Sequence, residues 1–162
     1  MAVFIDAENI YFTERSLKWR ISYSRLIKYL KKECPDVKCY VYKGIDKDIR
    51  GSRNIVRIME NCGYYVKTKP IKKIDIGEGR VKWKSNLDMA LGFDLVELAD
   101  SYDTAILFSG DSDFALPLSK AKALGKRVLV VSAKGHASKE LLDLAKYVRL
   151  NKLKDDISQN AI

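Results

Sequence analysis

Short apolar, β-branched runs alternate along the chain with segments whose apolar residues recur every three or four positions. Continuous apolar runs predict strands buried on both faces, and the three-to-four spacing predicts helices that pack along one face. We expect strands at residues 3–5, 37–42, 64–76, 80–84, 104–108, 128–131 and 147–150. We expect helices at residues 23–34, around 55–59, and at 87–98, 114–124 and 138–145.

Polar residues, proline and glycine mark the ends of several of these elements. Ser22 or Ser24 is placed to cap the helix that begins near residue 23, because a serine oxygen accepts hydrogen bonds from the free amides of a first helical turn. Pro35 stops that helix, and Gly63 and Gly125 close two later ones. The alternation predicts a doubly wound α/β domain, with a mostly parallel sheet and helices on both faces.

A basic hairpin interrupts this alternation. Gly77-Glu78-Gly79 is a turn between the strands expected at 64–76 and 80–84. Alternate positions of a strand face the same side, so this insertion has a cationic face. Its basic residues are Lys67, Lys69, Lys72, Lys73, Arg80, Lys82 and Lys84.

The hairpin is a candidate surface for a nucleic acid. Lys67, Lys69, Lys82 and Lys84 are placed to bind phosphates, and Trp83 offers a ring on which unpaired bases stack. Two other interpretations stay open. One is a solvated ribbon with Trp83 packed on the body of the protein, and the other is a homodimer formed through the exposed edge of the hairpin.

The charge of the chain supports a polyanionic partner. There are 30 lysine and arginine residues against 21 aspartate and glutamate residues, a net charge of +9. Such an excess on one domain favours nucleic acid or an anionic membrane surface, although a charge that only keeps the protein in solution is the plainer alternative.

Length and composition predict one domain, over residues 1–151, followed by a polar tail at 152–162 that frays. No apolar run approaches the ~20 residues of a membrane span, and the first residues do not resemble a signal peptide. The cysteines Cys34, Cys39 and Cys62 fit no metal or redox spacing. We therefore expect reduced thiols and a cytoplasmic location.

Carboxylates follow two of the predicted strands and open one helix. Asp6 ends the first strand, Asp111 and Asp113 follow the strand at 104–108, and Asp88 lies at the start of the helix at 87–98. In parallel sheets ligands bind at the carboxyl ends of the strands. Gathered carboxylates repel one another, and Mg²⁺ or Mn²⁺ relieves that repulsion while it activates water against a phosphate ester.

Each of these acids also has a structural interpretation. Asp111 or Asp113 is placed to cap the following helix, and Asp88 is placed to interact with a helix dipole. Asp94 is six residues beyond Asp88 and lies on another face of the helix, so we expect it to support the site without binding metal.

Three ordered segments resemble the NYN domain family and, within it, the LabA-like bacterial group. They are Val3-Phe4-Ile5-Asp6-Ala7-Glu8-Asn9-Ile10, then Lys84-Ser85-Asn86-Leu87-Asp88 with Asp94, then residues 103–114 with Ser109-Gly110-Asp111-Ser112-Asp113, followed by Pro117-Leu118 and Gly125-Lys126-Arg127-Val128. The match extends over nearly the whole chain, with Ser85 where the family commonly has glycine.

The resemblance implies a PIN-like Rossmannoid fold and a ribonuclease that depends on Mg²⁺ or Mn²⁺. The family's metal-binding acids correspond to Asp6, Asp88 and Asp111, and Asp113 completes the catalytic cluster. Asn9 is expected to steady the loop of Asp6 or to contact substrate, and Ser109 is expected at the substrate.

Two other functions remain open at this point. The first is an RNA-binding regulatory module that keeps the fold and has little catalytic activity. The second is a phosphoaspartyl phosphotransferase using Asp6, Ser109 and Lys134, although Glu8 stands where that class has a second aspartate. His136, the single histidine, is interpreted as a surface loop residue.

Overall fold

A computed structural model describes residues 1–46, 50–75, 77, 81–84 and 87–159. Within these ranges the chain forms a six-stranded parallel sheet in the order β3-β2-β1-β6-β7-β8. The strands are β1 Ala2–Asp6, β2 Lys38–Ile45, β3 Tyr65–Pro70, β6 Thr104–Phe108, β7 Arg127–Ser132 and β8 Lys146–Arg149. The predicted α/β architecture is therefore confirmed.

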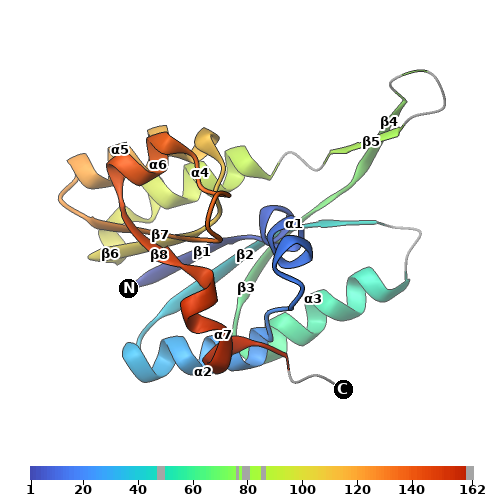
Figure 1. The fold of residues 1–162 in the computed structure, drawn as a ribbon, viewed down its shortest axis with the longest axis horizontal. Helices are drawn as coiled ribbons and strands as arrows, with labels where there is room; N and C mark the ends of the chain where they lie inside the picture. The colour runs from blue at the N-terminus through green and yellow to red at the C-terminus, as the bar shows by residue number, and fades with distance from the viewer. Residues whose placement is uncertain (47–49, 76, 78–80, 85–86, 160–162) are drawn as a thin grey trace.

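Helices cover both faces of this sheet, as Figure 1 shows. They are α1 Ala7–Leu17, α2 Tyr23–Glu33, α3 Arg50–Cys62, α4 Asp88–Glu97, α5 Ala115–Ala123, α6 Lys139–Leu144 and α7 Lys154–Ile157. Short 3₁₀ turns add η1 Ala99–Ser101, η2 Ser112–Phe114 and η3 Leu150–Leu153. In Figure 1, α4, α5 and α6 form one layer, and α2, α3 and α7 lie on the other side of the sheet.

Alternation along β1 divides the core into two parts. Val3 and Ile5 pack with the buried residues of α1, α2 and α7, while Ala2 and Phe4 pack with those of α4 and α5. Both sets are at most 1% exposed, which explains why the strand is apolar at every position. Because the rest of β1 is apolar and buried on both faces, Asp6 at its carboxyl end is the polar residue of this strand.

The predicted helix ends are largely confirmed. The Ser22 side chain accepts the Arg25 amide at the start of α2, and the Ser138 side chain accepts the Leu141 amide at the start of α6. Gly63 follows α3 with a φ of +98°, a backbone conformation in which a side chain is strained.

Helix α1 was not among the elements predicted from the sequence. Its inward face consists of Ala7, Ile10 and Thr13, whereas Tyr11 and Phe12 are more than half exposed. Because large aromatic residues point to solvent and a threonine points inward, the helix lacks a clear apolar stripe.

The segment expected as one strand at 64–76 is two strands that belong to different sheets. β3 pairs in parallel with β2 and forms the edge of the main sheet. β4 Lys72–Asp75 pairs in antiparallel fashion with β5 Val81–Lys84 in a separate two-stranded ribbon. The break falls at Ile71, whose amide still bonds to the carbonyl of Ile45. Lys67 and Lys69 therefore lie on the main sheet and not on the projecting hairpin seen in Figure 1.

The expectation of a frayed tail is wrong for residues 152–159. Ile157 is fully buried, and its carbonyl accepts the Ser22 amide at 2.8 Å. The Arg25 guanidinium donates to the carbonyls of Asp155, Asp156 and Ser158, which ties α7 to α2. One buried isoleucine and one arginine outweigh the polar composition of this segment, and residues 160–162 lie outside the described part.

None of the described helices is both long enough and apolar enough to span a bilayer. Cys39 is buried in the core, and Cys34 and Cys62 pack against it.

Candidate active site

The four predicted carboxylates lie at the carboxyl edge of the sheet, where helices begin. Asp6 ends β1 and caps α1, Asp111 follows β6 and caps η2, and Asp88 is the first residue of α4. Asp113 lies within η2. The parallel sheet brings these ends together because β1 and β6 are adjacent and in register from Ala2 to Ile5.

Asp6 is the most buried of these acids, with 7% of its surface exposed. Its Oδ1 accepts the backbone amides of Glu8 and Asn9 at 3.1 and 3.0 Å, and its Oδ2 accepts the Ser109 hydroxyl at 3.1 Å. Each carboxylate oxygen therefore has a donor, and the side chain is held in one orientation.

The electrostatic environment of Asp6 disfavours its charged form. Burial is the main cause that raises the pKa of Asp6 from 3.8 to about 6, and repulsion from Asp88 and Glu8 adds to the effect. The hydrogen bonds from Asn9 and Ser109 act in the opposite direction. A nearby cation stabilises the charged form of a carboxylate in this environment and offsets its repulsion from Asp88.

The loop after β6 is built around Ser109 and Asn9. Ser109 is fully buried; its oxygen accepts the Asp111 amide at 3.2 Å while its hydroxyl donates to Asp6. Asn9 Oδ1 accepts the Gly110 amide at 3.1 Å and joins α1 to the same loop. Because it is buried, Ser109 positions Asp6 and Asp111; this replaces the expectation that it contacts substrate. The Asn9 side chain thus steadies the loop of Asp111, where the expectation was the loop of Asp6, and its contact with substrate stays a prediction.

Gly110 is packed too tightly for any side chain. A Cβ atom at this position would lie 1.9 Å from the backbone oxygen of His136 and 3.0 Å from Ser132 Oγ. The Gly110 carbonyl also accepts the Ser138 amide at 2.9 Å. The loop that carries Asp111 is therefore wedged between α1 and the loop before α6.

Asp111 and Asp113 differ in environment. Asp111 is half-buried and its Oδ1 accepts the Asp113 amide at 3.0 Å, so the structural interpretation of Asp111 as a cap is confirmed. Asp113 is exposed. Asp111 can still bind another group while it caps η2, because an ionised carboxylate has further lone pairs and this one lies at the carboxyl edge of the sheet.

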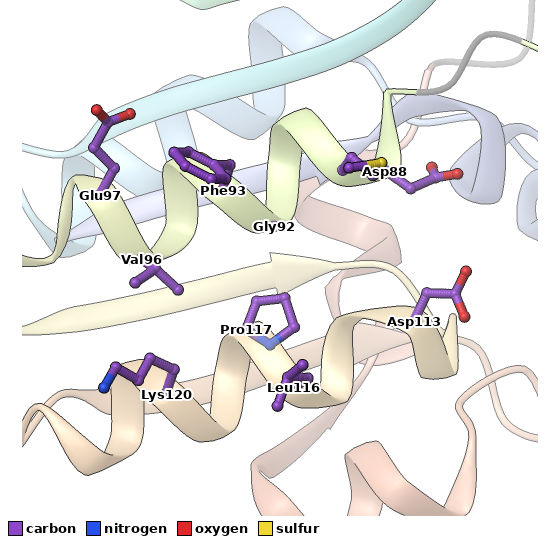
Figure 2. A pocket seen from close by; sticks show the side chains of 10 residues that line it. Asp88, Gly92, Phe93, Val96, Glu97, Asp113, Leu116, Pro117 and Lys120 are labelled. Atoms are coloured by element: carbon purple, nitrogen blue, oxygen red, sulfur yellow. The ribbon is translucent and has the colours of Figure 1, made fainter.

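Asp88 and Asp113 line one end of a groove between α4 and α5, and Figure 2 shows both carboxylates at that end. The groove has a volume of about 840 Å³. Its walls carry exposed Met89, Phe93 and Leu116, and Gly92 packs against Pro117 where the two helices approach. The two carboxylates thus face open space at the end of an apolar channel.

Asp94 has partners that the sequence did not suggest. It is 6% exposed, its Oδ2 lies 2.6 Å from Lys67 Nζ, and it accepts a hydrogen bond from the Tyr42 hydroxyl. Burial and this hydrogen bond raise the pKa of Tyr42. Asp6, Tyr42 and Lys67 pair in register across β1, β2 and β3. The row places the Cα atom of Lys67 two strands, about 10 Å, from that of Asp6.

The other predicted substrate contacts are distributed over two sheets. Lys69 lies on β3, and Lys82, Trp83 and Lys84 lie on β5, paired with Ile74, Lys73 and Lys72. The side chains of the β5 residues lie outside the described part of the chain. Their contact with substrate stays a prediction.

The donor set fits a hard divalent cation with few protein ligands. Mg²⁺ commonly binds through one or two carboxylates and is completed by water and substrate phosphates, and Asp6 with Asp88 supplies such a pair. Among the described residues, no group of three or more histidine, cysteine, aspartate or glutamate side chains is arranged to hold a metal. The arrangement fits a site completed by solvent and substrate better than a closed protein cage.

His136 lies beside α1 and not among the carboxylates. Its Nε2 is 3.0 Å from Ser16 Oγ, and the residue is half-buried. The remaining groups that sequence reasoning missed at this edge are Tyr42 and the pairing of Lys67. No sequence signal identified them, because the strands and helix that bring them together are far apart along the chain.

Comparison with known proteins gives the chain a family context. A family model described as the NYN domain matches residues 1–151. The "Low amplitude and bright protein LabA" of Synechococcus elongatus is 30% identical over 164 residues, covering 98% of this chain and 88% of that protein. A crystal structure of a protein of unknown function from Vibrio parahaemolyticus superposes with a TM-score of 0.77 at 24% identity, covering 98% of this chain and 94% of that one. The structural likeness shows a shared fold.

Proposed function

Because this chain belongs to the NYN domain family, we propose that it is a metal-dependent ribonuclease that hydrolyses phosphodiester bonds of RNA. The observation that carries the proposal is Asp6, a carboxyl group with a pKa raised by burial, at the strand edge where Asp88, Asp111 and Asp113 also lie. A chain of net charge +9 that gathers its acids at one edge is suited to attract a polyanion and to hold a cation against it.

In this proposal Asp6 and Asp88 hold Mg²⁺ or Mn²⁺, and Asp111 and Asp113 add negative charge beside them. The resemblance assigns Asp111 to the metal as well, but no three of the described acids are arranged to hold one. When bound, the metal lowers the pKa of a water ligand and offsets the charge that develops on the phosphate. Ser109 and the first amides of α1 fix the orientation of the Asp6 carboxylate. Asn9 holds the loop of Asp111 against α1, so the carboxylates keep their spacing.

The proposed RNA contacts flank this cluster. Lys67 presents its ammonium group from β3 while Asp94 holds it in place. Lys69 lies two residues further along β3, toward the carboxyl edge, and Lys82, Trp83 and Lys84 lie on the ribbon that leads to α4. Basic groups near a cleavage site raise the local concentration of a polyanionic substrate and make its affinity depend on salt.

The decisive experiment is cleavage of a labelled single-stranded RNA with Mg²⁺, Mn²⁺ or EDTA, with Asp111→Asn beside the wild type. Asparagine still accepts the Asp113 amide, so the cap and the fold are retained while a negative charge is lost. We expect the rate of metal-dependent cutting to fall at least about 100-fold in the variant. Loss of a group that only orients a metal ligand lowers activity by up to about 100-fold, so a larger fall indicates a direct role. RNA affinity in EDTA should stay within about twofold.

Asp103→Asn is the matched control, because Asp103 is an exposed carboxylate at the opposite end of β6. It should cut RNA like the wild type. Retention of RNA by a wild-type protein that cuts with neither metal would refute the nuclease and support the RNA-binding module. An Asp111→Asn protein that is unfolded by circular dichroism would assign Asp111 to structure alone.

A further inference from the structure

Helix α1 carries an exposed aromatic and basic face that begins beside the carboxylate cluster. Tyr11 is 51% exposed and Phe12 is 62% exposed, and their rings meet edge to face with centroids 5.5 Å apart. At 1.5 Å per residue the Cα atoms of these two residues lie about 8 Å along the helix axis from that of Asp6. These rings contact each other, and neither residue belongs to the buried core, so core packing does not explain them.

Basic groups continue this face away from the carboxylates. The Arg15 guanidinium lies 5.9 Å from the centre of the Tyr11 ring, within cation–π range. Lys18 ends the helix in a left-handed conformation with a φ of +58°. Arg15, Lys18 and Arg20 line a pocket of about 440 Å³ with Tyr11, Glu14 and Trp19.

The acidic group within this pocket is already engaged. Glu14 Oε1 accepts the Ile21 amide at 2.8 Å, and the pKa of Glu14 is raised mainly by burial. The loop that carries Lys134 and His136 lies against the same helix through the contact of His136 with Ser16. Lys134 is exposed and adds another positive charge on this side.

Stacking rings with interleaved cations are typical of surfaces that bind single-stranded nucleic acid without sequence preference. The groove between α4 and α5 offers exposed apolar residues too, but Asp88, Asp113 and Glu97 line it against one lysine, Lys120. That charge balance disfavours a phosphate backbone. The face of α1 has the opposite balance and starts at the proposed cleavage site.

We propose that the exposed face of α1 is a stacking platform for single-stranded RNA, with bases on Tyr11 and Phe12 and phosphates on Arg15 and Lys18. This inference rests on the proposed ribonuclease function, and it adds the side on which the strand leaves the site. It assigns the substrate class as unpaired RNA, because paired bases present no free face to a ring. The strand then passes over the carboxylates between α1 and the basic ribbon.

The test is the affinity of Tyr11→Ala/Phe12→Ala for a fluorescent 12-nucleotide oligouridine, measured by anisotropy in EDTA. A second probe is an abasic phosphodiester chain of the same length, which keeps the charges and lacks the rings. We expect the double variant to bind oligouridine at least about fivefold more weakly, the low end of the effect of one stacked base. Its affinity for the abasic chain should change less than twofold.

Two further variants separate stacking from structure. Tyr65→Ala removes a ring that is 57% exposed at the amino end of β3, far from the carboxyl edge, and should leave oligouridine binding unchanged. Tyr11→Phe/Phe12→Tyr keeps both rings and should restore wild-type affinity. Equal affinity of wild type and double alanine variant for oligouridine would overturn the proposal, and so would an equal loss on both probes.

Cleavage kinetics distinguish this proposal from the nuclease itself. If both hold, Tyr11→Ala/Phe12→Ala raises KM and leaves kcat within about twofold, since neither ring belongs to the carboxylate cluster. Metal-dependent cutting with unchanged KM and unchanged affinity keeps the nuclease and rejects the platform. Ring-dependent binding by a wild-type protein that cuts nothing keeps the platform and rejects the nuclease.

Discussion

Replacing Asp6 by asparagine should stabilise the fold at neutral pH while it removes a carboxylate from the proposed active site. Burial raises the pKa of Asp6 from 3.8 to about 6, so the folded state pays to keep this group charged. At 1.36 kcal/mol per pKa unit the cost is about 3 kcal/mol. Asparagine accepts the same amides of Glu8 and Asn9 without a charge, and it is a good helix cap.

The sign of the pH dependence follows from proton binding. Between pH 4 and 6 the folded wild type holds a proton on Asp6 that the unfolded chain has released, so wild-type stability falls as pH rises through this window. The cost is absent below pH 4 and complete above about pH 7. Asp6→Asn lacks this titration. The variant should therefore gain about 2–3 kcal/mol on the wild type between pH 3.5 and pH 7.5, or roughly 6–10 °C in Tm for a domain of this size.

Urea unfolding in EDTA at several pH values measures this difference directly. Asp143→Asn on α6 is the control, because it removes an exposed carboxylate and should change stability by less than about 0.5 kcal/mol. Addition of Mg²⁺ should then raise the unfolding midpoint of the wild type and leave that of Asp6→Asn unchanged. A stability difference between wild type and Asp6→Asn that does not vary with pH would refute the assignment of Asp6 as a buried carboxylate with a raised pKa.

Two further predictions concern the basic groups around the site. Lys67→Met should lower the free energy of unfolding by about 1–2 kcal/mol, because the buried Asp94 carboxylate loses its ion pair. The loss is modest because solvent partly screens the half-exposed lysine. Asp94→Asn in the same chain should recover most of this loss in urea unfolding, and purely additive effects of the two changes would contradict the coupling. Lys82→Glu/Lys84→Glu should reduce the slope of log affinity for oligouridine against log salt concentration by about 1.4, since each phosphate contact on a single strand contributes ~0.7. Lys38→Glu at the amino end of β2 should leave the slope unchanged. An unchanged slope in the ribbon variant would show that the ribbon does not contact the RNA.

The sheet and its chemistry were predictable because local patterns and topology agree. Continuous apolar runs such as 104–108 indicate strands covered on both faces, and parallel strands put their carboxyl ends together. That argument brings Asp6 and Asp111 to one edge before any coordinates are known. The residue pattern also singled out Asp88 at the start of a helix, and the motif resemblance assigned it a metal-binding role. Its electrostatic effect on Asp6 supports its place in the cluster.

Other features depend on contacts that sequence patterns do not encode. Helix α1 was missed because Tyr11 and Phe12 face solvent, so its apolar spacing carries no clear period. Lys67 was assigned to a hairpin, yet β3 pairs with β2, and its partner Asp94 comes from a helix that follows the ribbon. The C-terminal segment looked polar, and a single fully buried side chain, Ile157, anchors it.

The tight packing of Gly110 bears on how this domain can be re-engineered. A methyl group there would collide with the backbone of His136 and push the loop of Asp111 away from Asn9. Libraries that aim to change cleavage preference should therefore leave position 110 untouched. Ser112, two residues further along, is exposed, so a library can vary the side chain at that position. The same criterion applies to other natural or designed chains of this fold. A residue larger than glycine at the equivalent position indicates a different loop conformation and a different spacing of the acids.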